Sequence, residues 1–75
     1  SDASWQAALY SGKPLEHKPA VQVIAESRDS LGKDGRLVIR ESATEPEIRA
    51  MAESDDAGLV DAVVDEIAAT IKQVA

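Results

Sequence analysis

Four side chains that can bind an anion lie close together in the middle of the chain. Arg40 and Arg49 flank a short segment that carries the hydroxyl groups of Ser42 and Thr44. Guanidinium groups bind tetrahedral anions such as phosphate through paired hydrogen bonds, and hydroxyls and the unpaired backbone N–H groups of a tight loop add further donors. These residue types favour a site for a tetrahedral anion.

An ordinary polar hairpin explains the same composition about equally well. Glu41, Glu45 and Glu47 lie in the same segment, so its acidic residues outnumber its arginines. Exposed ion pairs contribute only about 0–1 kcal/mol, so arginines that are solvated or paired with nearby glutamates need no ligand. A site here must depend on the geometry of its side chains, because its net charge does not favour an anion.

The residues on both sides of this segment alternate between apolar and polar. The apolar positions are Leu37, Ile39, Ile48, Ala50 and Ala52. A period of two predicts strands, and a connection this short predicts an antiparallel hairpin. Because successive side chains of a strand point to opposite faces, Arg40 and Arg49 are expected to share the face turned away from the core.

The segments before the hairpin predict one strand and one helix. Alternation from Ser4 to Tyr10 indicates a strand. Val21, Ile24, Ala25 and Leu31 recur at helical spacing. They predict a helix from about Pro19 to Leu31, which Pro19 opens and Gly32 ends.

The segment after the hairpin predicts a second helix. Ser54, Asp55 and Asp56 supply short side-chain acceptors and acidic charge at its start. Its apolar stripe consists of Leu59, Val60, Val63, Val64, Ile67, Ile71 and Val74, and its outer face carries Asp61, Asp65, Glu66 and Lys72. The pattern is typical of an amphipathic helix that packs on a sheet.

The order β-α-β-β-α predicts an α+β fold in which a small antiparallel sheet carries two helices on one face. We expect residues 1–75 to form a single domain. A chain this short buries only about 60% of its unfolded surface, so its stability is expected to be marginal.

Composition and charge exclude several classes of partner. Eight basic and fourteen acidic residues give a net charge of −6, which argues against nucleic acid and against an anionic membrane surface. No apolar run reaches the length of a membrane span, and no signal peptide is recognisable. The chain has no cysteine, which is compatible with the cytoplasmic location that we expect. Since it begins with Ser and not Met, we expect an excised piece of a larger enzyme.

The run from Arg40 to Arg49 resembles the signature R-x-S-G-T-E-P-x-x-R in the last domain of the phosphoglucosamine mutases, a family of the α-D-phosphohexomutase superfamily. The likeness is specific from Gly35 to Glu53. In that family the loop grips the phosphate of a sugar phosphate at the end far from the reaction. The resemblance therefore implies phosphate-binding roles for Arg40, Ser42, the backbone at Ala43, Thr44 and Arg49.

Three positions depart from the family pattern. Ala43 stands where the family usually has Gly, which tolerates a positive φ. If the loop needs that conformation, Ala43 costs roughly 1 kcal/mol or more. Glu41 and Glu47 also add negative charge beside the proposed phosphate. These departures affect the expected affinity more than the expected place of the site.

For the whole protein, the resemblance implies a mutase that interconverts glucosamine 6-phosphate and glucosamine 1-phosphate. The parent enzyme would work through a phosphoserine and a bisphosphorylated intermediate, with Mg²⁺ on the catalytic side. The segments that carry this chemistry in the family are missing here, so we expect no catalytic residue, metal ligand or cofactor in this chain. Its expected partners are a sugar phosphate and the remaining domains of the parent enzyme.

A second hypothesis is a stand-alone acidic carrier or protein-interaction module. The triplet Asp29-Ser30-Leu31 in a short acidic chain resembles the Asp-Ser-Leu triplet of the acyl carrier proteins, in which the serine carries phosphopantetheine. In those proteins the triplet opens a helix, whereas here it is expected to end one. An interaction module would use the apolar helix from Leu59 to Val74.

Overall fold

The computed structural model describes residues 1–8, 13–42 and 47–74. The segments in which apolar and polar residues alternate form a three-stranded antiparallel sheet. Its strands are β1 (Asp2–Ala8), β2 (Arg36–Ser42) and β3 (Glu47–Glu53). The strand order is β1-β3-β2, so β3 lies in the centre and pairs with both neighbours. The hairpin predicted from the alternation on either side of the loop is confirmed.

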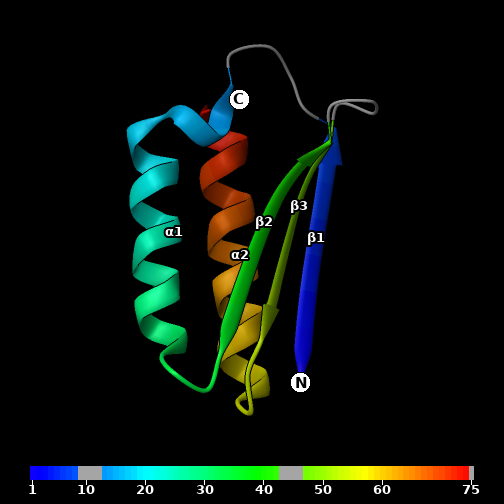
Figure 1. The fold of residues 1–75 in the computed structure, drawn as a ribbon. Coiled ribbons are helices and arrows are strands. Elements are labelled where there is room, and N and C mark those ends of the chain that lie inside the picture. Colours follow the sequence, from blue (N-terminus) through cyan, green and yellow to red (C-terminus); the bar gives the residue numbers. More distant parts are fainter. Residues whose placement is uncertain (9–12, 43–46, 75) are drawn as a thin grey trace.

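Two helices form the second layer. They are α1 (Lys18–Leu31) and α2 (Ala57–Val74), and a short 3-10 helix, η1 (Pro14–Glu16), precedes α1. Figure 1 shows α1 and α2 side by side on the same face of the sheet. The predicted α+β fold with the order β-α-β-β-α is therefore confirmed, with η1 as an addition.

The core lies between the sheet and the two helices, and α2 contributes most of its helical residues. From β3, Ile48, Ala50 and Ala52 are at most 1% exposed. From α2, the buried residues are Val60, Val63, Val64, Ile67, Ala68 and Ile71. The predicted apolar stripe is thus the packed face of α2, and burying side chains of this size contributes about 1.5–3 kcal/mol each.

The ends of both helices are fixed as the sequence predicts. The N–H of Leu59 donates to Asp56 Oδ1 over 3.1 Å, and the N–H of Asp56 donates to Ser54 Oγ over 3.2 Å, so these side chains cap α2. Gly32 ends α1 with a φ of 66°, in the left-handed region that glycine adopts without strain.

Arg28 joins α1 to the hairpin. Its Nη1 donates to the backbone carbonyl of Leu37 over 2.7 Å, in a partly buried position. This contact ties the last turns of α1 to β2 and so helps to hold the strand that carries Arg40.

The two layers differ from the sequence prediction in detail. β1 begins at Asp2 and not at Ser4, and Tyr10 lies outside the described residues. In α1 the buried residues are Ala20, Val23, Ser27 and Leu31. Val21, part of the pattern that predicted this helix, is 55% exposed, because the small side chains of Ala20 and Ser27 face the core instead.

Within the described part of the chain, no helix combines the length and the apolar character that a membrane span requires.

Candidate functional site

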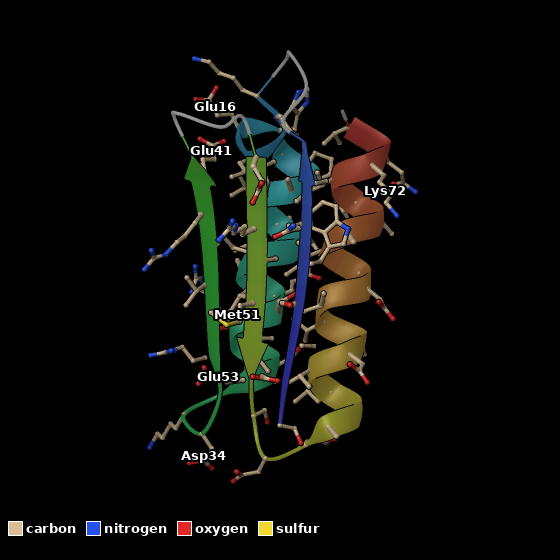
Figure 2. All side chains as sticks on the ribbon, turned by 90° about the vertical axis from the view of Figure 1, so that its right-hand side faces the viewer. Glu16, Asp34, Glu41, Met51, Glu53 and Lys72 are labelled. Carbon is tan, nitrogen blue, oxygen red and sulfur yellow. The ribbon has the colours of Figure 1, made fainter. Side chains whose placement is uncertain are left out.

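In the described part of the chain, no helix covers the second face of the sheet, which we call the open face. Residues that are paired across an antiparallel ladder point to the same side of the sheet. The outward pairs of β2 and β3 are Arg36 with Glu53, Val38 with Met51, and Arg40 with Arg49, and Glu47 is the next outward position of β3. Figure 2 views the molecule from this side, and Met51 and Glu53 mark the outward positions of β3.

Arg40 and Arg49 form one row of the open face. They are directly opposite in the register of β2 and β3, and both are exposed. The Cβ atoms of such a pair lie about 4.5–5.5 Å apart. The expectation that both arginines project from the face opposite the core is confirmed, since Ile48 beside Arg49 is buried.

The arginines of the open face differ in their acidic partners. Arg49 Nε donates to Glu47 Oε1 over 2.5 Å, and Arg36 Nη2 lies 3.3 Å from Glu53 Oε1. Arg40 has no acidic partner among the residues that the structure describes. Two like charges directly opposite each other destabilise a sheet slightly, so an anion placed between Arg40 and Arg49 would remove a repulsion.

A groove of about 630 Å³ lies on the open face. Its lining includes Arg36, Arg40, Arg49, Gln6, Val38 and Met51. The arginines surround an apolar floor, and the groove reaches β1 on the far side of β3. The arrangement can hold an anion at the arginine row and a less polar group beside it.

The structure brings together only part of the predicted set. Ser42 is the last residue of β2 and pairs with Glu47 in the ladder, but its side chain lies outside the described structure. Ala43 and Thr44 also lie outside the described residues. The phosphate-binding role of the five predicted residues therefore stays a prediction, whereas the placement of Arg40 and Arg49 is a finding.

Two further residues lie next to Arg49: Gln6, which the sequence did not assign to the site, and Glu47, which the sequence placed beside it only as a source of negative charge. Gln6 is paired with Arg49 across β1 and β3, so the row runs Gln6, Arg49, Arg40 over the three strands. Glu47 contacts Arg49 directly. Alternation indicated the outward direction of both side chains, but only the register of β1 on β3 reveals that Gln6 lies beside Arg49.

The described residues contain no group of three or more His, Cys, Asp or Glu side chains that could hold a metal ion. Among the acidic residues before α2, Asp56 caps that helix and Glu53 pairs with Arg36. The described residues therefore offer no fitting ligand set for the Mg²⁺ that the resemblance attributes to a parent enzyme.

Ser30, the residue on which a carrier function would depend, is exposed in the last turn of α1. The triplet Asp29-Ser30-Leu31 thus ends a helix, as the sequence predicted. This is the opposite of its place in the acyl carrier proteins, where it opens one.

A family model and similar curated relatives indicate the same protein family. Residues 7–70 match the family described as phosphoglucomutase/phosphomannomutase, C-terminal domain. The chain is 54% identical over 65 residues to the phosphoglucosamine mutase of Methylobacterium radiotolerans and 56% identical over 65 residues to that of Mesorhizobium japonicum. Each match covers 87% of this chain and 14% of the relative.

A third relative is the phosphoglucosamine mutase of Brucella abortus, which is 59% identical over 56 residues. This match covers 75% of the chain and 12% of the relative. The chain thus spans only a small part of the length of the curated relatives that it matches.

Proposed function

Because the chain belongs to the phosphoglucomutase/phosphomannomutase C-terminal domain family, we propose that it binds the phosphate group of a sugar phosphate at the hairpin end of its open face. The relatives are phosphoglucosamine mutases, so we propose glucosamine 6-phosphate and glucosamine 1-phosphate as the ligands. The parent enzyme would interconvert these two compounds.

The observation that supports this proposal is the direct pairing of Arg40 with Arg49 on the open face. Their side chains come from adjacent strands, whose spacing is fixed by the backbone hydrogen bonds of the sheet. A guanidinium can donate two parallel hydrogen bonds to phosphate oxygens, and charge-assisted bonds of this kind are the strong ones. Two such groups in one row can hold a phosphate from both sides.

The role of this domain in the parent reaction would be to position the substrate. Holding the phosphate at one end of the sugar phosphate aligns the oxygen at the other end for in-line phosphoryl transfer. The binding energy of the non-reacting end then contributes to the rate of the transfer step. We propose that the isolated chain is not catalytic, and the Mg²⁺ and the cytoplasmic location of the parent enzyme remain parts of this proposal.

A titration of the full chain with glucosamine 6-phosphate, followed by ¹H–¹⁵N NMR, tests the proposal. We expect the backbone and Nε–H signals of Arg40 and Arg49 to shift, with a dissociation constant in the millimolar range because one domain supplies only part of the grip. Glucosamine without phosphate is the control and should leave these signals in place. Shifts that avoid both arginines would contradict the proposal.

A further inference from the structure

Glu47 lies within the candidate phosphate site and not beside it. It is paired with Ser42 in the ladder, and it lies two positions from Arg49 on the same face of β3. Arg49 Nε donates to its Oε1 over 2.5 Å. The site therefore already contains a carboxylate that contacts one of its two arginines.

The burial of the two side chains shows how firmly this carboxylate is held. The side chain of Glu47 is 21% exposed, whereas that of Arg49 is 65% exposed. Because most of its side chain is covered, Glu47 has less freedom to move away than an exposed side chain when another anion arrives, although its hydrogen bond to Arg49 lies at the exposed surface.

We propose that Glu47 determines the affinity and the charge selectivity of this site, because its carboxylate competes with the ligand's phosphate for Arg49. This inference rests on the proposed function. In the free protein Glu47 neutralises Arg49, and a phosphate that binds between the arginines has to displace or share this contact. It also approaches a like charge within a few ångströms, which weakens its binding.

A ligand that displaces Glu47 must interact with Arg49 more strongly than one carboxylate does. A phosphate monoester carries about −1.5 to −2 charges near neutral pH and offers three strong acceptor oxygens. A carboxylate ligand carries a single charge, as Glu47 does, and gains nothing by replacing it. Glu47 would thus exclude sugar acids and other carboxylates from the row, at the cost of weaker phosphate binding.

The pair of Arg36 with Glu53 supplies a matched control on the same face. It joins the same residue types across β2 and β3, at 3.3 Å, with side chains 66% and 48% exposed. It lies at the end of the strands away from the candidate site, three ladder rows on the open face from Ser42 and Glu47. A change of charge at Glu53 therefore reproduces the loss of one carboxylate without touching the row of Arg40.

The test compares Glu47→Gln with Glu53→Gln in the full chain. Dissociation constants for glucosamine 6-phosphate, inorganic phosphate and acetate are measured by NMR titration at low ionic strength. We expect Glu47→Gln to tighten both phosphate ligands about tenfold, or about 1.4 kcal/mol, and to make acetate binding detectable. Glu53→Gln should change each constant less than twofold.

The outcomes separate this inference from the proposed function. If the wild type responds at Arg40 and Arg49 but Glu47→Gln binds phosphate equally or more weakly, Glu47 orients Arg49 and does not compete, and this inference is wrong. If neither protein responds at these arginines, the proposed function fails and the inference fails with it.

A second measurement covers the case in which Glu47→Gln does not fold. The Nε–H signal of Arg49 in the wild type reports the contact with Glu47 directly. We expect it to shift as phosphate is added, in step with the signals of Arg40. A signal that stays fixed while Arg40 responds shows that the ligand leaves the ion pair intact, and this overturns the inference.

Discussion

Arg40 and Arg49 face each other across adjacent strands of the open face, although nine positions separate them in the sequence. The ladder between β2 and β3 sets the positions of their Cα atoms relative to each other. This relationship supports the proposed phosphate site at the hairpin end of the open face.

Replacing Arg40 with Gln should weaken the binding of glucosamine 6-phosphate by about tenfold to a hundredfold, because a hydrogen bond to a charged group is worth about 1.5–3 kcal/mol. The free energy of unfolding should change by no more than about 0.5 kcal/mol, since the side chain is exposed and faces a like charge. NMR titration and urea denaturation measure the two quantities. Lys72→Gln, which removes an exposed positive charge on α2 away from the groove, is the control, and an equal loss of affinity in it would show that only general charge matters.

Replacing Ile67 with Ala should destabilise the domain by about 2–5 kcal/mol, because this side chain is fully buried against the sheet and leaves a cavity. In a domain this small such a loss unfolds much of the population at room temperature. Urea denaturation followed by circular dichroism measures it. Val21→Ala removes a side chain that is 55% exposed, and it should cost less than about 0.5 kcal/mol. Similar losses in both variants would contradict the position of the core.

Replacing Asp56 with Ala should lower the free energy of unfolding by about 1 kcal/mol, because the N–H of Leu59 loses its side-chain acceptor. Thermal denaturation detects the change. Asp55→Ala is the matched control, since it removes the same charge one position earlier and leaves the bond to Leu59 in place. A larger effect from Asp55 than from Asp56 would mean that charge at the start of α2 dominates over the cap.

Replacing Gly35 with Ala should destabilise the domain by about 1–3 kcal/mol, as overpacking does. A Cβ at this position would lie 2.7 Å from Leu31 Cβ and 2.8 Å from the Leu31 carbonyl oxygen. Gly58→Ala should have the opposite sign and stabilise by up to about 1 kcal/mol, because a Cβ there meets only Asp56 Oδ1 at 3.5 Å within α2. Urea midpoints for both variants check the pair. A stabilised Gly35→Ala would show that α1 and β2 are less close than the structure has them.

Local patterns predicted the hairpin and α2 well. Both elements have signals that are local in the sequence. The alternation around Ile48 has a period of two, and α2 has both a cap at Asp56 and a continuous apolar stripe. The face of α1 was harder to predict, because a buried Ser27 and an exposed Val21 reverse the usual preference. The sequence pattern alone does not reveal which small residues of α1 face the core.

Only part of the candidate site could be predicted from the sequence. Alternation within two strands was sufficient to place Arg40 and Arg49 on one face. The neighbours of Arg49 required more, since Gln6 approaches it only through the register of β1, a pairing between residues far apart in the chain. The contact with Glu47 depends on a side-chain conformation that no periodicity determines.

The alternation of β3 also separates two kinds of selection on the same seven residues. Mutations at Ile48, Ala50 and Ala52 affect the packing of the core, while those at Glu47, Arg49 and Met51 affect the open face, where we propose that the ligand binds. Because the two sets point to opposite faces of the sheet, substitutions on the open face can change ligand binding without a loss of core packing. A small domain with little stability to lose can in this way remain adaptable.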